Sequence, residues 1–242
     1  VFLRDGVDII VTGGTPAAKG ALAATKTVPI IFLAGDPIGS GLAKSLARPG
    51  GNATGLAGLT PELTAKRLEM LRDIVPKGKR FEMLADPSNP LYGTYKEAAQ
   101  SAARILGVRL EMYAASTPVG LTQALAALVR SKPDGVLVSA RIEFLPNRAE
   151  IAQAMRKARI PAIYPAREYH AEGALVSYGF SMRDLAKQSA YYVDKILKGV
   201  SPAELPIQQS RTFPLVVDVR EARKLGITMP ESIMILATHV LE

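Results

Sequence analysis

The loop at residues 12–15, Thr-Gly-Gly-Thr, joins an apolar run to a stretch with helical spacing. Backbone N–H groups at a helix N-terminus, together with the helix dipole, favour an anion such as a carboxylate or a phosphate. Gly13 and Gly14 allow a ligand to approach the backbone closely. A tight turn capped by Thr15 explains the same residues without a ligand. The loop has neither the Gly-Lys-Ser/Thr of a P-loop nor the spacing of a dinucleotide fingerprint.

Asp86, Ser88 and Asn89 place an acid, a hydroxyl and an amide directly after a second apolar run. Asp86 can accept a hydrogen bond from a ligand ammonium group, while Ser88 and Asn89 can bond to the ligand's carboxylate. An Asx turn followed by a helix cap uses the same residue types. The segment therefore predicts either ligand contacts or a local turn.

Two arginines follow further strand ends. Arg141 and Arg167 can each hold a carboxylate through two parallel hydrogen bonds. Glu143 and Glu168 come soon after them, so local ion pairs are the alternative.

Three tyrosines, Tyr164, Tyr169 and Tyr178, cluster around the same breaks. Their rings can stack on a planar ligand. Packing in the core, with each hydroxyl bonded, explains them equally well.

Composition argues against most catalytic chemistry. The absence of cysteine excludes disulfides, thiolate metal sites and cysteine nucleophiles, and the two histidines, His170 and His239, lie far apart. No spacing of carboxylates indicates a general acid and base. The net charge is +8, but the basic residues are scattered singly and only 6% of residues are aromatic, which disfavours a nucleic-acid partner. We expect a binding protein with no cofactor and no metal.

Strand and helix patterns alternate along the chain, which is typical of a parallel α/β architecture. Buried strands are expected near residues 7–11, 80–84 and 135–138, each opening into a loop and then a helix. Ligands bind at the carboxyl ends of strands in open α/β sheets. The polar loops that follow these strands are therefore candidate binding loops.

Breaks rich in glycine or polar residues, at residues 50–58, 172–179 and 201–214, predict three passages of the chain between two lobes. Residues 52–58 are more typical of a crossing segment than of a core strand. A short helix is expected at residues 38–46. One larger doubly wound sheet is the alternative architecture.

Several longer motifs occur together in this chain. They are Gly35-Asp36-Pro37, residues 46–55 (Leu-Ala-Arg-Pro-Gly-Gly-Asn-Ala-Thr-Gly), residues 66–71 (Lys-Arg-Leu-Glu-Met-Leu) leading to Val75-Pro76, residues 86–90, Ser177-Tyr178-Gly179 and residues 192–199. In this combination, which covers essentially the whole chain, the sequence resembles the ABC-transporter substrate-binding proteins of the tryptophan/tyrosine type.

The resemblance implies a periplasmic-binding-protein-like fold of type I, an α/β fold with two doubly wound parallel-sheet lobes joined by three crossovers. The first lobe would contain residues 1–53 and 176–207, and the second residues 54–175 and 208–242. The implied function is that of a periplasmic or otherwise extracytoplasmic receptor. It would deliver a small carboxylate ligand, an amino acid and within that class an aromatic one, to an ABC permease.

By the same resemblance, strand-end segments of both lobes would line one cleft. The expected ligand-binding residues are Thr12, Gly13, Gly14, Thr15, Asp36, Asp86, Ser88, Asn89, Ser139, Arg141, Tyr164, Arg167, Glu168 and Tyr178.

The chain departs from the family pattern at its start. Family members carry a signal peptide and then a strand, a helix and a second strand before the position of Val1. We expect an N-terminally truncated first lobe, and an unpaired strand there would favour a homodimer.

A ligand-sensing regulatory domain, such as the effector half of a repressor, has the same fold and is the alternative function. A DNA-binding helix-turn-helix or a membrane segment in the complete gene would favour it. An α/β enzyme acting on a small acid is a third hypothesis, which the absent cysteines and scarce histidines disfavour.

Overall fold

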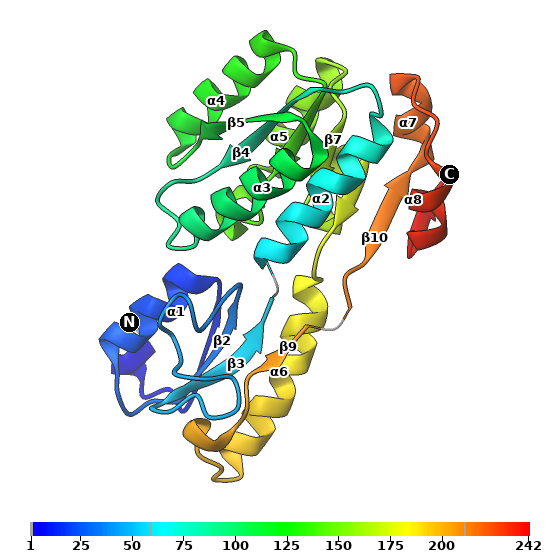
Figure 1. Cartoon of the computed structure of the whole chain (residues 1–242). Coiled ribbons are helices and arrows are strands. Elements are labelled where there is room, and N and C mark those ends of the chain that lie inside the picture. Colours follow the sequence, from blue (N-terminus) through cyan, green and yellow to red (C-terminus); the bar gives the residue numbers. More distant parts are fainter. Residues whose placement is uncertain (1, 59, 211) are drawn as a thin grey trace. The chain divides into compact units, whose positions relative to one another are not determined.

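The computed structural model describes residues 2–58, 60–210 and 212–242 (Figure 1). The chain forms two compact units. The first contains Val1–Thr60 and Phe180–Thr212, and the second contains Pro61–Gly179 and Phe213–Glu242, so the chain passes between them three times. None of the helices in the described part of the chain has both the length and the apolar character needed to cross a membrane.

A four-stranded parallel sheet forms the centre of the first unit. Its strands, in spatial order, are β1 (Ile10–Gly13), β2 (Ile30–Ala34), β3 (Ala53–Ala57) and β9 (Gln208–Gln209). Phe32 packs on the face covered by α1 (Thr15–Ala24), and its neighbour Ile31 packs on the face covered by α6 (Met182–Leu197). This alternation explains why β2 is apolar throughout, because both of its faces are buried.

Strand β3 corrects the expectation that residues 52–58 form a crossing segment. All five residues of β3 are buried, and the strand pairs with β2 along its whole length. A Cβ added at Gly55 would lie 2.0 Å from the backbone oxygen of Phe32. The glycine therefore permits a close approach of two central strands and does not indicate an exposed linker.

The short helix expected at residues 38–46 is also wrong. Residues 37–41 form consecutive turns, in which the N–H of Ser40 donates to the Asp36 carbonyl at 3.1 Å and that of Leu42 to the Pro37 carbonyl at 2.8 Å. Gly41 has a φ of 73°, which lies in the left-handed region and does not continue a helix.

The second unit contains a seven-stranded sheet. In spatial order its strands are β11 (His239–Leu241), β10 (Leu215–Asp218), β8 (Val176–Tyr178), β7 (Ala162–Tyr164), β6 (Gly135–Val138), β4 (Arg80–Ala85) and β5 (Arg109–Ala114). The strands from β8 to β5 are parallel, whereas β10 runs antiparallel to β8 and pairs in parallel with β11. The segment after Met229 supplies β11 and the helix α8 (Glu231–Leu236).

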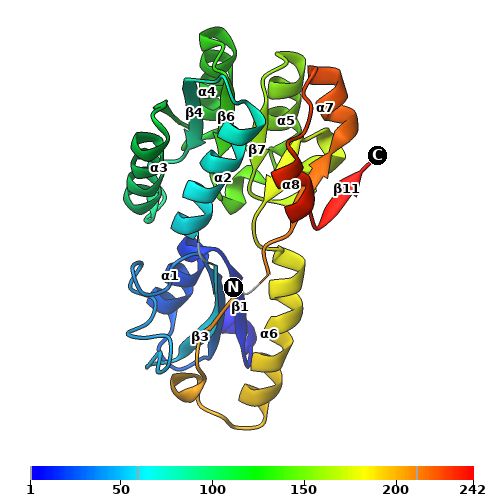
Figure 2. The ribbon, with the colours of Figure 1, turned by 45° about the vertical axis from the view of Figure 1, so that its right-hand side comes forward.

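Helices cover both faces of this sheet (Figures 1 and 2). One core layer lies under α2 (Thr60–Ile74), α3 (Tyr92–Leu106), α7 (Val219–Leu225) and α8, and the other lies under α4 (Pro118–Ser131), α5 (Arg148–Lys157) and the 3-10 helix Arg167–Glu172. Met83 belongs to the first layer and the adjacent Leu84 to the second. The doubly wound arrangement thus follows from strands whose alternate side chains enter two different cores.

Candidate functional site

The carboxyl ends of the parallel strands in the second unit lie along one edge of the sheet. The register pairs Leu84 of β4 with Val138 of β6, and Tyr164 of β7 with Ser177 of β8. The polar residues that follow these strands therefore meet at this edge. We call it the carboxyl edge, and it comprises residues 86–89, 139–141, 164–168 and 178–179.

Asp86 lies at the carboxyl edge with its side chain buried, and the protein itself satisfies its carboxylate. Oδ1 accepts from the backbone N–H of Ser88 at 2.9 Å, and Oδ2 accepts from Ser88 Oγ at 2.8 Å. Ser116 Oγ also donates to Oδ1, and Arg141 Nη1 forms an ion pair with Oδ2. The Asx turn is confirmed, and the carboxylate has little acceptor capacity left for a ligand ammonium group.

Arg141 is similarly engaged. Besides its ion pair with Asp86, its Nε lies 3.2 Å from Glu143 Oε2, and its guanidinium lies 5.9 Å from the ring centre of Phe144. The side chain borders a cavity of about 150 Å³ that is also lined by Ser116 and Asn147. The predicted local pair with Glu143 is confirmed, and the guanidinium serves mainly to neutralise Asp86.

Asn89 and Ser139 contribute to the backbone of the carboxyl edge. Asn89 Oδ1 accepts from the N–H of Leu91 at 2.9 Å, which stabilises the turn before α3. Ser139 is buried, and its N–H donates to the carbonyl of Leu84 at 3.0 Å, while its own carbonyl accepts from Arg141. Both residues lie at the expected edge, in roles that shape the loops.

The tyrosines divide between the core and the carboxyl edge. Tyr164 is buried and stacks on Tyr169, with ring centres 4.8 Å apart, inside the layer under α4 and α5. Burial raises the pKa of the Tyr164 phenol far above its ordinary value. Tyr178 ends β8, is only partly buried, and tilts against Phe213 at 6.4 Å. Of these three rings, Tyr178 offers a surface to a ligand.

Arg167 and Glu168 begin the 3-10 helix that follows β7. Arg167 is exposed and Glu168 is partly exposed. Both residues lie at the carboxyl edge, and their role in binding a ligand stays a prediction.

The first unit places its predicted residues at the carboxyl ends of β1 and β2. Gly14 precedes α1 with a φ of 87°, and its N–H donates to the carbonyl of Leu33 at 2.8 Å. Thr15 is the first helical residue, so the expectation that it caps the helix is wrong. Thr12 Oγ1 is buried and has no hydrogen-bond partner in the part of the chain that the structure describes, which leaves one polar atom beside Gly13. Asp36 Oδ1 accepts from the N–H of Gly39 at 2.8 Å and closes a turn.

Arg67 of α2 is a candidate that sequence reasoning missed. Its Nε donates to the carbonyl of Tyr178 at 2.7 Å, so its guanidinium reaches the carboxyl edge, yet the residue is only 1% exposed. It lies four residues after Leu63 and four before Leu71, both buried. A charge on the apolar stripe of an amphipathic helix was the signal that could have identified it.

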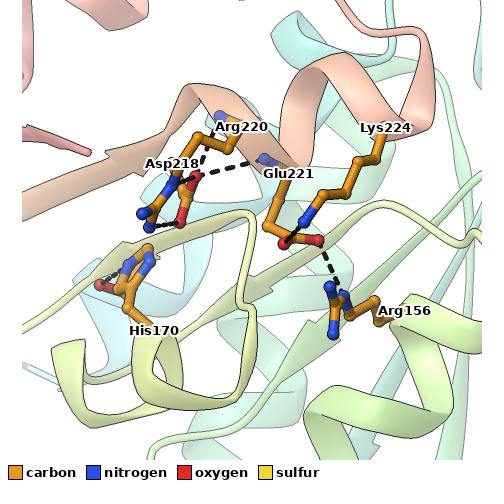
Figure 3. A network of polar contacts seen from close by, with 7 residues as sticks. Arg156, His170, Asp218, Arg220, Glu221 and Lys224 are labelled. Atoms are coloured by element: carbon orange, nitrogen blue, oxygen red, sulfur yellow. Dashed lines mark hydrogen bonds and ion pairs between the residues drawn. The ribbon is translucent and has the colours of Figure 1, made fainter. Parts of the chain in front are cut away.

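A second polar network lies elsewhere in this unit (Figure 3). Its members are Arg156, His170, Asp218, Arg220, Glu221 and Lys224. Arg220 holds Asp218 through two hydrogen bonds, of 3.0 and 2.7 Å, and Arg156 and Lys224 both pair with Glu221. Because β10 runs antiparallel to β8, Asp218 lies at the edge opposite the carboxyl edge.

This network borders a cavity of about 360 Å³. Both of its carboxylates have cationic partners from α5 or α7, so the cluster ties these helices to the sheet. Burial lowers the pKa of His170 to about 4, and its Nε2 lies 3.0 Å from Ser177 Oγ. Among the described residues, no group of histidines and carboxylates is suited to hold a metal ion.

Two α/β units with parallel sheets, three chain passages and polar loops at the carboxyl edges define a type I periplasmic-binding-protein-like fold. The chain belongs to the ABC transporter substrate binding protein family, whose model matches residues 1–241. It is therefore a member of a family of binding proteins and not of enzymes.

Two relatives are similar to this chain in sequence, and a third protein is similar in fold. The chain is 27% identical over 207 residues to a tyrosine-binding protein of Clostridioides difficile, covering 85% of this chain but only 59% of that protein's length. It resembles an ABC domain from Streptococcus pneumoniae solved in complex with L-Trp, with a TM-score of 0.90, 28% identity and coverage of 99% and 82% of the two chains. A periplasmic binding protein/LacI transcriptional regulator from Alkaliphilus metalliredigens matches at a TM-score of 0.58 and 12% identity, over 88% of this chain and 77% of that one, and shows the fold alone.

Proposed function

We propose that this protein is the extracytoplasmic receptor of an ABC importer. It binds a small carboxylate solute, an amino acid with an aromatic side chain, in a cleft between its lobes and delivers it to an ABC permease. Family membership supports the transport role, and the ligands named for the proteins of Clostridioides difficile and Streptococcus pneumoniae support the ligand class.

The observation that carries the ligand class is the composition of the carboxyl edge in the second unit. The Arg67 guanidinium contacts the end of β8, where the partly exposed ring of Tyr178 lies against Phe213. A cation beside aromatic rings matches the two parts of an aromatic amino acid, its carboxylate and its ring.

Titration calorimetry of the full-length protein tests the ligand class. L-Tyrosine and L-tryptophan should bind with measurable heat and raise the unfolding temperature, whereas lysine and glucose should do neither. Full-length protein that binds no aromatic amino acid, but binds a sugar, would contradict the proposal. Loss of tyrosine or tryptophan uptake on deletion of the gene would test the transport role separately.

A ligand-sensing regulatory domain remains the alternative function, supported only by the likeness in fold to a LacI-type regulator. Homodimerisation through the first lobe stays a prediction, which the molar mass of the full-length protein in solution would test.

A further inference from the structure

Arg67 is a buried cation without an anionic partner in the described part of the chain. It ranks among the largest fully buried side chains, and no ion pair between described residues includes it. Its Nε donates to the neutral carbonyl of Tyr178, and its Nη2 is buried with no hydrogen-bond partner among the described residues. Native proteins rarely leave a buried charge in this state, because desolvating it is costly unless an anion compensates.

The charge itself persists at neutral pH. Burial lowers the pKa of Arg67 to about 10, and the residues close enough to oppose that shift are three tyrosines, Tyr95, Tyr178 and Tyr169. A guanidinium with this pKa is still protonated at pH 7. The guanidinium is therefore a cation surrounded by aromatic residues.

The backbone around Arg67 is closely packed at the carboxyl edge. A Cβ added at Gly179 would lie 2.0 Å from the carbonyl oxygen of Pro165 and 3.5 Å from Arg67 Nη2. The glycine thus allows the segments that follow β7 and β8 to converge beside the guanidinium. Tyr169 Oη, from the 3-10 helix Arg167–Glu172, is also buried and has no hydrogen-bond partner in the described ranges of the chain.

A purely structural role explains this arrangement poorly. Arg67 occupies the apolar stripe of α2 between Leu63 and Leu71, where methionine or leucine would pack without a desolvated charge. Its hydrogen bond to Tyr178 uses one donor of five. An anion bound at the guanidinium would compensate its buried positive charge.

We propose that Arg67 binds the carboxylate of the transported solute at the carboxyl edge of the second unit, while the ring of the solute packs against Tyr178. This inference rests on the proposed function and assigns its carboxylate anchor. Because Nη2 has no exposed surface, binding requires that the packing around the guanidinium opens. Tyr178, whose carbonyl accepts the bond from Nε, is partly exposed.

The test is a cycle of two ligands and two proteins, measured by calorimetry on the full-length chain. L-Tyrosine is compared with tyramine, which lacks the carboxylate, in the wild type and in Arg67→Met. We expect the wild type to bind tyrosine about 100-fold more tightly than tyramine, and Arg67→Met to bind the two almost equally. Lys66→Met removes an exposed charge from the same helix and should preserve the wild-type preference.

The two proposals fail in different ways. Suppose that the wild type binds tyrosine, but Arg67→Met weakens the binding of tyrosine and of tyramine by the same factor, or weakens the binding of neither ligand. The role of Arg67 is then overturned while the receptor function stands. If the wild type binds no aromatic amino acid, the ligand class fails.

A second measurement, urea unfolding without ligand, then decides the role of Arg67. An unpaired guanidinium predicts an unfolding midpoint for Arg67→Met no lower than that of Lys66→Met. A clearly lower midpoint would show that the guanidinium is structural and would overturn the inference.

Discussion

Arg67 and Arg141 reach the carboxyl edge of the second unit with largely buried side chains, and their surroundings differ. Arg141 neutralises Asp86, pairs with Glu143 and lies over Phe144, so its charge is fully used within the protein. Arg67 is more deeply buried and has one neutral acceptor, the carbonyl of Tyr178. The comparison teaches that Asp86 and Arg141, which stand out in the sequence, are satisfied within the fold. The residue with unused charge lies on a helix stripe that is otherwise apolar.

Among the substitutions considered, Asp86→Ala should have the largest effect on stability. Asp86→Ala should lower the free energy of unfolding by about 4 kcal/mol, because it breaks a buried ion pair and leaves Arg141 and two hydroxyls without their acceptor. Urea unfolding measures this loss. Asp36→Ala is the matched control, since that carboxylate accepts a backbone bond in a turn and should cost about 1 kcal/mol. Equal losses would show that Asp86 is not the centre of a buried network.

A smaller effect is expected beside Arg67. Gly179→Ala should destabilise the protein by about 3 kcal/mol, because its Cβ would lie 2.0 Å from the carbonyl oxygen of Pro165 and force the converging segments apart. Gly93→Ala, in the first turn of α3 with open space around it, should be neutral or stabilising by up to about 1 kcal/mol. If thermal unfolding finds both variants equally stable, the close packing around Arg67 is not required.

The network around Asp218 differs from the carboxyl edge in that its contribution to stability should depend on pH. Burial lowers the pKa of His170 to about 4, whereas an unfolded histidine titrates near 6.5. Between these values the unfolded chain binds more protons, so the stability contributed by neutral His170 is complete above about pH 6.5 and is lost as the pH falls toward 4. The loss should amount to about 3 kcal/mol at pH 4.

Urea unfolding of the wild type and of His170→Gln at several pH values between 4 and 7 checks this. The variant should have a flatter profile over that range. Parallel profiles would mean that His170 titrates normally in the folded protein.

The alternation of apolar runs and helical stretches was enough to predict the α/β architecture and to bring Asp86, Ser139 and Arg141 to one sheet edge. The pattern did not predict strand β3. A glycine such as Gly55 occurs both in central strands and in linkers, and the close approach to the backbone of Phe32, seen in the structure, distinguishes the two. Local sequence also did not show that Asp86 and Arg141 would form an ion pair, since that depends on the pairing of β4 with β6.

Arg67 escaped prediction for the opposite reason. An arginine within a charged helix segment is usually solvated. The apolar spacing around Arg67 was a signal in the sequence, and the packing of α2 onto the end of β8 establishes that the side chain is buried. Tyr164 and Tyr178 illustrate the same limit, because both end a strand, yet one stacks inside the core and the other remains partly exposed.

The most direct test of the contrast between the two arginines is the affinity of Arg67→Met and Arg141→Met for L-tyrosine, measured by calorimetry on folded, full-length protein. Unused charge at Arg67 predicts that Arg67→Met loses about 100-fold in affinity, and that Arg141→Met loses less than about 5-fold. A large loss in Arg141→Met with unchanged binding in Arg67→Met would contradict the account.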